Sequence, residues 1–177
     1  MPVENTTSYS SVRLYVVMGA AGCGKSTIGE ELAAIFEAKF FEGDDFHSPE
    51  NKAKMAAGTA LTDDDRWPWL RTLVNAMCEG KQTTVSSCSS LKRSYRDLIR
   101  EHANEPVVFI HLHGSRELLS ARLSGREEHF MNSSLLDSQI ETLEPLDSSE
   151  LGITVDINAT VPQILDVIVK RLESSSF

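Results

Sequence analysis

The sequence has few of the features that mark secreted, membrane-spanning or nucleic-acid-binding proteins. Three cysteines in 177 residues cannot form a closed disulfide set, which favours a reducing compartment. The longest strongly apolar run, residues 14–18, is far too short to span a bilayer, and the polar first eleven residues carry no signal-peptide pattern. Basic residues are outnumbered, with 17 Lys and Arg against 26 Asp and Glu. The net charge of -9 disfavours nucleic acid and anionic membranes as partners, so we expect a cytoplasmic protein.

The composition that remains is typical of a globular domain. Hydrophobic residues make up 41% of the chain and charged residues 24%, and this length suits one hydrophobic core. The first eleven residues are rich in Ser and Thr, which is typical of a loose terminal segment. No repeat or linker divides the rest. We therefore predict a flexible tail over 1–11 and a single domain over 12–177.

Short β-rich runs alternate with segments whose apolar residues recur at helical spacing. This alternation predicts an α/β fold of three layers, in which helices cover both faces of a five-stranded parallel sheet. Thr62 and Asp65 have the spacing of a helix-capping pair. The third strand is unusually polar, with Thr and Ser where a central parallel strand would be aliphatic. The predicted strands are 13–18, 39–41, 83–88, 106–111 and 152–157, and the predicted helices begin near residues 25, 49, 62, 91, 115 and 161.

A phosphate-binding motif lies between the first strand and the first helix. The sequence GAAGCGKS matches G-x-x-x-x-G-K-[ST] in the context that gives the motif its mechanical meaning. Its glycines let backbone amides converge on phosphate oxygens, Lys25 can reach the β and γ phosphates, and Ser26 can ligate Mg²⁺. We therefore expect ATP and Mg²⁺ as cofactors. The expected nucleotide-binding residues are Gly19, Ala20, Ala21, Gly22, Cys23, Gly24, Lys25, Ser26 and Thr27.

The motif alone does not separate a kinase from a switch or a motor. A guanine-nucleotide switch would need Asn-Lys-x-Asp, but the one candidate, residues 51–54, ends in Lys and lies in a predicted helix. A motor-type ATPase would carry an acidic pair at the end of an apolar strand, whereas the third strand here ends in Cys88 and two serines. These absences favour a small-molecule kinase.

Five separated blocks, in order from about residue 14 to 170, resemble the gluconate kinases. Apart from the phosphate loop, they are Gly43-Asp44-x-x-His47, residues 51–70 with Asp63-Asp64-Asp65-Arg66-x-Pro68-Trp69-Leu70, residues 88–98, residues 122–130 and residues 139–145. The resemblance implies a P-loop kinase fold with a mobile lid over about 124–134. It also implies transfer of the γ-phosphoryl group of ATP to the 6-hydroxyl of D-gluconate. Relatives of this kind are often dimers, so the implied partners are gluconate and a second copy of the chain.

Residue chemistry then assigns the roles that such a transfer needs. Asp44 follows the second strand at the ligand-binding edge of the sheet and is the predicted base or hydroxyl-orienting group. His47 fits equally well as a donor to a substrate hydroxyl or as a structural cap. Arg66 opposes the dipole of its helix, a cost that binding of the gluconate carboxylate would explain. Lys92 and Arg96, on a basic helical stripe, are placed at the same acid.

Arg122 and Arg126 resemble lid arginines that neutralise charge on the transferring phosphoryl group and, with Lys25, complete the predicted catalytic set. Two departures from the family pattern suggest that turnover could be lost. Glu128 replaces a glycine in the lid block, and the third strand is polar. The alternatives are a kinase for another small acid such as shikimate, and a nucleotide-binding protein that has lost turnover. Cys23 in the phosphate loop also predicts sensitivity to thiol reagents.

Overall fold

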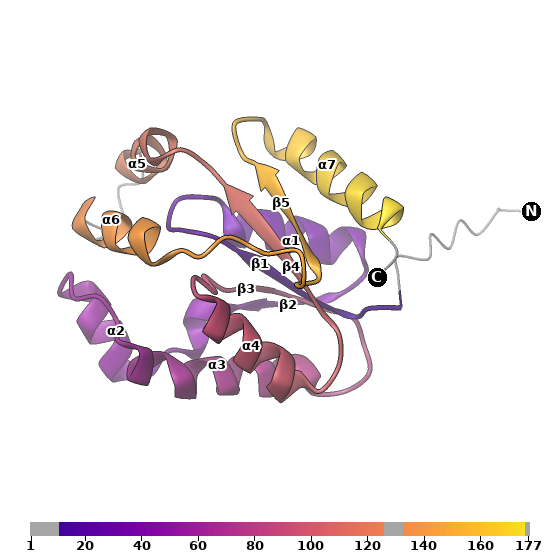
Figure 1. Ribbon diagram of the computed structural model, residues 1–177, viewed down its shortest axis with the longest axis horizontal. Helices are drawn as coiled ribbons and strands as arrows, with labels where there is room; N and C mark the ends of the chain where they lie inside the picture. Colours follow the sequence, from indigo (N-terminus) through magenta and orange to yellow (C-terminus); the bar gives the residue numbers. More distant parts are fainter. Residues whose placement is uncertain (1–10, 126–132, 176–177) are drawn as a thin grey trace, which may run out of the picture.

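The computed structural model describes residues 11–125 and 133–175 of the chain. Within them, strands and helices alternate as the sequence predicts (Figure 1). The predicted tail, apart from residue 11, and the central part of the predicted lid lie outside the described residues. The elements are β1 (Leu14–Met18), α1 (Lys25–Ile35), β2 (Lys39–Glu42), the 3₁₀ helix η1 (Gly43–Phe46), α2 (Pro49–Ala56), α3 (Asp63–Cys78), β3 (Thr84–Ser87), α4 (Arg93–Ala103), β4 (Val107–His113), α5 (Arg116–Ser124), α6 (Ser133–Thr142), β5 (Gly152–Asp156) and α7 (Val161–Ser174).

The five strands form one parallel sheet in the order β2-β3-β1-β4-β5. Successive strands of a parallel sheet need a crossover, and the helices between them supply it. The predicted three-layer α/β class is confirmed. All strands run in one direction, so the loops that follow β1, β2 and β3 open at the same edge of the sheet, and α2, α5 and α6 gather at that end of the molecule (Figure 1).

Two hydrophobic cores lie on opposite faces of this sheet because alternate strand residues point in opposite directions. Tyr15 and Val17 of β1 pack into the core beneath α1 and α7, whereas Val16 and its neighbours pack against α3 and α4. Figure 1 shows these helix pairs on the two sides of the sheet. The sheet is therefore packed on both faces, and the loops at its edge connect strands and helices that belong to these cores.

Local sequence signals explain where the helices begin. Thr62 caps α3, its hydroxyl accepting from the Asp65 backbone N–H at 3.2 Å while the Asp65 carboxylate accepts from the Thr62 N–H at 2.8 Å. The predicted capping pair is confirmed as a reciprocal capping box. Ser115 caps α5 in a similar way, accepting from the Leu118 N–H. Helix α6 has no counterpart among the segments predicted from periodicity.

The polar third strand is present, and all four residues of β3 are buried. Its last residue, Ser87, accepts a hydrogen bond from the Gly43 N–H at 3.1 Å and donates one to the Glu42 carboxylate, so it fastens the end of β2. The hydroxyls of Thr84 and Ser86 find no hydrogen-bond partner among the described residues. The sheet thus keeps two unpaired buried hydroxyls in β3, a cost that the aliphatic alternative would avoid.

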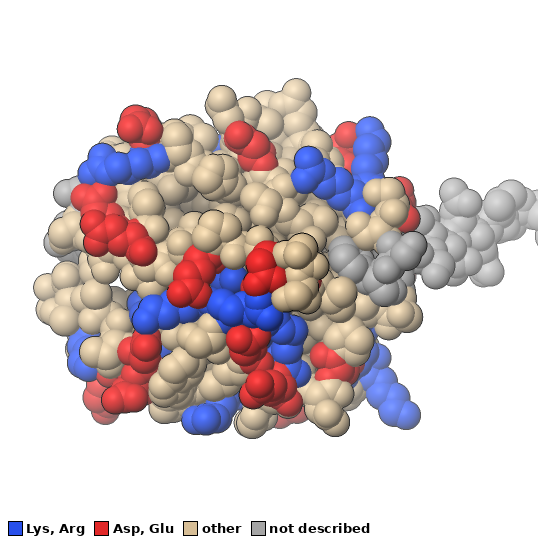
Figure 2. All heavy atoms as spheres, in the orientation of Figure 1, with Lys and Arg blue, Asp and Glu red and all other residues tan. Residues whose placement is uncertain are grey.

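Basic and acidic side chains lie beside one another on the face of the molecule shown in Figure 2 and do not gather into a large patch of one sign. Ion pairs such as Arg93 with Asp97 and Arg116 with Asp137 account for part of this mixing. No helix in the described part of the chain has both the length and the apolar character to cross a membrane.

Candidate active site

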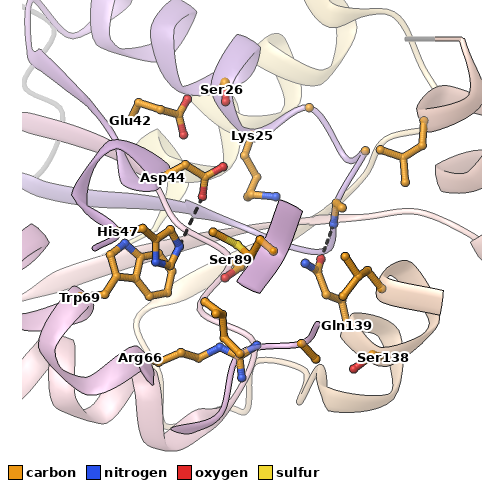
Figure 3. Close-up of a pocket in the computed structure, with 18 of the residues that line it drawn as sticks. Lys25, Ser26, Glu42, Asp44, His47, Arg66, Trp69, Ser89, Ser138 and Gln139 are labelled. Carbon is orange, nitrogen blue, oxygen red and sulfur yellow. Dashed lines mark hydrogen bonds and ion pairs between the residues drawn. The ribbon is translucent and has the colours of Figure 1, made fainter. Parts of the chain in front are cut away.

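A pocket opens at the edge of the sheet where β1, β2 and β3 end. It draws on the phosphate loop, the end of β2, the start of α3 and helix α6 (Figure 3). Nine predicted site residues line it, of which Ala21, Gly22, Gly24 and Thr27 belong to the phosphate loop and the start of α1. Lys25 and Ser26 come from the start of α1, Asp44 and His47 from the segment after β2, and Arg66 from α3. The fold therefore brings the phosphate loop, the end of β2 and the start of α3 together at one pocket.

The phosphate loop has the conformation that its glycines predict. Gly19, Gly22 and Gly24 all have positive φ, at 141°, 83° and 92°. A Cβ on Gly19 would lie 2.7 Å from the Leu112 carbonyl oxygen, so only glycine fits there. Helix α1 starts directly after Gly24 without a side-chain cap, which leaves its first N–H groups available to an anion at the positive end of the helix dipole.

Helix α6 reaches the same loop through Gln139, whose side-chain Oε1 accepts a hydrogen bond from the Ala21 N–H at 2.7 Å. Figure 3 shows Gln139 and Ser138 on the side of the pocket opposite Asp44. Periodicity gave no reason to place this glutamine in the site. Residues 139–145 form one of the blocks that resemble gluconate kinases, and that was the only signal.

Glu42 is the last residue of β2, and Asp44 lies in the first turn of η1. Both are near Lys25 and Ser26 (Figure 3). The close contact between β2 and β3 depends on Gly43, because a Cβ there would lie 2.0 Å from the Ser87 carbonyl oxygen. The Asp44 side chain is 82% exposed and points into the pocket. This position suits a group that must meet a substrate hydroxyl beside bound phosphates.

His47 lines the pocket but is itself buried. Its ring stacks on Trp69 with 3.9 Å between centroids, and its Nε2 lies 3.8 Å from an Asp44 carboxylate oxygen. Burial, followed by the charge of Arg66, lowers the pKa of His47 to about 4. The imidazole is therefore neutral near pH 7. This position serves packing against Trp69 and also brings the ring to the wall of the pocket.

Arg66 points into the pocket from the first turn of α3 (Figure 3). Its Nη1 donates to the hydroxyl of Tyr95 at 2.7 Å, and its guanidinium lies 5.2 Å from the centre of the Tyr95 ring. Arg66 forms no ion pair with any of the described residues. A pocket arginine without a carboxylate partner is well suited to bind an acid.

The structure corrects the predicted placement of Arg96 at the acid. Its side chain is fully buried, with Nε 2.6 Å and Nη2 2.9 Å from the two carboxylate oxygens of Glu150. Its Nη1 also donates to the Ser90 carbonyl oxygen at 3.0 Å. The prediction placed the basic stripe on the side of the helix opposite Leu91, Tyr95 and Leu98. Instead, the ion pair with Glu150 compensates the charge of Arg96 in the interior, so Arg96 lies on the buried side of the helix next to Tyr95.

Lys92 also lies outside the residues that line the pocket. Its Nζ contacts the Asp63 carboxylate at 3.0 and 3.2 Å. The structure therefore pairs Lys92 with Asp63, and the direct contact of Lys92 with the acid stays a prediction.

The predicted lid arginines have different outcomes. Arg122 lies at the end of α5, where Nη2 donates to the Ile157 carbonyl oxygen at 2.8 Å and Nη1 is 3.8 Å from the position of a Cβ on Gly24. It is next to the phosphate loop but does not line the pocket as described. Arg126 lies outside the described residues, as does Glu128.

The predicted thiol sensitivity of Cys23 does not fit its position. Cys23 is only 1% exposed, and Cys88 is 2% exposed with its pKa raised by burial to about 11. A thiol reacts as the thiolate and must be reachable, so both cysteines are poorly suited to alkylation in the folded protein.

The oxygen groups that could hold a divalent metal are the Ser26 hydroxyl, predicted from the motif, and the Glu42 carboxylate beside it (Figure 3). Mg²⁺ prefers such oxygen ligands and keeps much of its water shell, so a few protein ligands suffice. Within the described residues no group of three or more His, Cys, Asp or Glu side chains forms a metal cluster. The donor set therefore fits a metal carried with a nucleotide better than a permanent metal centre.

Comparisons with known proteins agree with the blocks noted in the sequence. Residues 14–146 match the family described as AAA domain. The chain is 40% identical to a probable gluconokinase of Xenopus tropicalis over 88% of this chain and 90% of that protein. It is also 40% identical to the thermoresistant gluconokinase of Escherichia coli, over 85% and 87% of the two chains.

A solved structure shows the same agreement in three dimensions. The crystal structure of a gluconokinase from Sinorhizobium meliloti 1021 superimposes with a TM-score of 0.84 and 44% identity, covering 90% of each chain. Identity at this level over nearly the full length reaches well beyond the phosphate loop, which many unrelated kinases share. The chain belongs to the gluconokinase family.

Proposed function

We propose that this protein is a gluconokinase that transfers the γ-phosphoryl group of ATP to the 6-hydroxyl of D-gluconate, giving 6-phospho-D-gluconate and ADP. One observation carries the proposal: a phosphate loop, an exposed aspartate and an arginine without an ion-pair partner among the described residues line a single pocket. The named relatives support the same substrate. The proposal includes a cytoplasmic location and gluconate as the small-molecule partner. Light scattering would show whether a homodimer forms.

The phosphate loop is the proposed site for the triphosphate of ATP. Backbone N–H groups at the start of α1 and the Lys25 ammonium group are the positive groups in this part of the pocket. Lys25 donates to the Ala20 carbonyl oxygen at 3.2 Å, a bond within the loop that keeps the ammonium group close to the cradle. Ser26 and Glu42 are the proposed protein ligands of Mg²⁺, which would neutralise phosphate charge when bound.

Asp44 is the proposed acceptor of the proton from the attacking hydroxyl. The carboxylate is exposed to the pocket, and the neutral His47 beside it can hydrogen-bond a substrate hydroxyl without adding charge. Arg66 is the proposed partner of the gluconate carboxylate, and a charged hydrogen bond of this kind contributes about 1.5–3 kcal/mol. The acid end would therefore fix the sugar chain so that its terminal hydroxyl faces Asp44 and the γ-phosphate.

A coupled assay of ADP release over a panel of acceptors tests the proposal. The panel contains D-gluconate, other aldonic acids, shikimate and the neutral polyol D-glucitol, with a sample lacking acceptor as the blank. D-gluconate should give the highest kcat/KM, and mass and NMR analysis should place the phosphate on its 6-oxygen. Preference for shikimate or another acid would replace the proposed substrate. ATP binding without ADP release for every acceptor would indicate a nucleotide-binding protein that has lost turnover.

A further inference from the structure

Behind Arg66, away from the pocket, lies a chain of three polar side chains. The Arg66 Nη1 donates to the Tyr95 hydroxyl at 2.7 Å, and that hydroxyl donates to an Asp63 carboxylate oxygen. Lys92 closes the chain, with its Nζ 3.0 and 3.2 Å from the two oxygens of the same carboxylate. Residues of two helices, α3 and α4, therefore support one guanidinium.

The chemistry of these groups fixes the direction of every hydrogen bond. Arginine and lysine can only donate, and an ionised carboxylate can only accept. Tyr95 must therefore give its single proton to Asp63 and use an oxygen lone pair for Arg66. The bonds from Tyr95 and then Lys92 hold the pKa of Asp63 below its ordinary value, so the carboxylate stays charged and the arrangement is maintained near neutral pH.

The arrangement also leaves Arg66 without an ion pair among the described residues. The Asp63 carboxylate is paired with Lys92, and Tyr95 stands between it and the guanidinium. A direct Arg66–Asp63 pair would neutralise Arg66 and occupy the N–H groups that an acid needs. With Tyr95 in place, one Nη1 bond holds the guanidinium and the rest of its donors remain for a ligand.

Tyr95 is a rigid support for this purpose. It is only 1% exposed, and the ring of Trp67 packs edge-on against it with 5.3 Å between centroids. Buried aromatic rings have few alternative rotamers, so the position of the hydroxyl is set by the core between α3 and α4. The Arg66 guanidinium beside the ring adds a cation–π contact.

We propose that Tyr95 is a positioning residue that holds Arg66 toward the substrate acid and keeps it from pairing with Asp63, while Lys92 acts through Asp63 and does not touch the substrate. This inference rests on the proposed binding of gluconate by Arg66. Tyr95, Asp63 and Lys92 together keep Arg66 from pairing with Asp63. The enzyme then selects an acceptor that carries an acid group, because Arg66 can bind that group.

The first test is Tyr95→Phe, which keeps the ring and removes the hydroxyl. The KM for D-gluconate should rise about tenfold, while kcat and the KM for ATP stay within about twofold, because a hydrogen bond to a charged group is lost and Arg66 can turn toward Asp63. Tyr15→Phe is the matched control, since Tyr15 is also buried and its hydroxyl donates to the Val12 carbonyl oxygen at 3.1 Å, in the core on the other face of the sheet. Its gluconate KM should not change.

The second test separates an indirect role of Lys92 from direct contact with the acid. Lys92→Met frees Asp63 to pair with Arg66, so the gluconate KM should rise severalfold. Adding Asp63→Asn removes the competing carboxylate, so the KM of the double variant should return toward that of the single Asp63→Asn variant. If Lys92 touched the acid, its loss would weaken gluconate binding equally in both backgrounds.

These outcomes are separable from failure of the proposed function. If the unmodified protein does not phosphorylate gluconate, the proposed substrate is wrong before any variant is compared. If it does, an unchanged gluconate KM in Tyr95→Phe, or a rise shared equally with ATP, overturns the positioning role. Thermal melting of each variant identifies any that do not fold. Should Tyr95→Phe be one of these, the Lys92 and Asp63 double-mutant cycle decides the proposal alone.

Discussion

The two halves of the pocket are built in different ways. The phosphate half consists mainly of backbone from one continuous segment, residues 19–26, held by glycine conformations and the start of α1. In the half proposed to bind the acid, Arg66 of α3 is held from behind by Tyr95 of α4, which in turn contacts Asp63, the partner of Lys92. A backbone site is set by local sequence, whereas a side-chain site is set by how two helices pack.

This difference predicts how each half responds to substitution. Loss of a side chain at the phosphate half leaves the amide cradle in place, because the N–H groups belong to the backbone. Loss of a side chain at the acid half leaves a neighbouring polar group without its hydrogen bond, and that group can then pair with a different residue. Substitutions at the junction between the halves, in the acid half and behind it should therefore affect different measurements.

The largest effect is expected for Asp44→Asn at the junction of the two halves. Removing a general base should lower kcat by about 10²- to 10⁴-fold, while the affinity for ATP changes little because the cradle is intact. Single-turnover kinetics and calorimetric titration with ATP measure the two quantities. Asp45→Asn, in the same 3₁₀ helix, is the matched control and should keep its turnover. A parallel loss of ATP binding in Asp44→Asn would remove Asp44 from the role of base.

The second largest effect is expected for Arg96. The sequence prediction placed this residue at the acid, but the structure buries it in an ion pair with Glu150. Arg96→Met leaves Glu150 buried without a partner, and breaking a buried ion pair lowers the free energy of unfolding by about 3–5 kcal/mol. Urea denaturation measures this loss, and adding Glu150→Leu should recover much of it. A variant of full stability with a raised gluconate KM would show that Arg96 reaches the substrate after all.

Arg66→Ala should give the opposite result to Arg96→Met. The free energy of unfolding should change by less than about 1 kcal/mol, because Arg66 is partly exposed and has no ion-pair partner among the described residues. The gluconate KM should rise about 10- to 100-fold, as expected for loss of a charged hydrogen bond. The KM for ATP is the internal reference. An equal rise in both KM values would place Arg66 in the nucleotide half.

The same contrast explains what the sequence could and could not predict. The phosphate loop, the five strands and the capping box at Thr62 depend on near neighbours in the chain, and all were predicted. Asp44 and His47 line the pocket because they follow a strand that ends at this edge of the sheet. The resemblance to gluconate kinases then drew Arg66 into the same site.

The residues that sequence reasoning misplaced or missed are on helices whose orientation depends on tertiary packing. Periodicity cannot show that Arg96 turns inward, because the signal that permits it is Glu150, 54 positions away. In the same way, Gln139 reaches Ala21 from 118 positions away on a helix that periodicity did not identify. Polar residues at helical spacing predict a solvated face unless the distant partner is known.

The smallest effect is expected from a change of pH, which tests whether the free energy of unfolding depends on buried histidines. His111 in β4 is buried, and burial, followed by the charges of His113 and Arg96, lowers its pKa from 6.5 to about 4. The unfolded chain therefore binds more protons between these values, so stability is complete above about pH 6.5 and falls as the pH drops toward 4. Lowering the pH from 7 to 5.5 should reduce the free energy of unfolding by about 1 kcal/mol for each such histidine. His47 contributes similarly. Urea unfolding at both pH values should show a smaller decrease for His111→Asn than for the unmodified protein, and an identical decrease would mean that the buried imidazole is already protonated in the folded state.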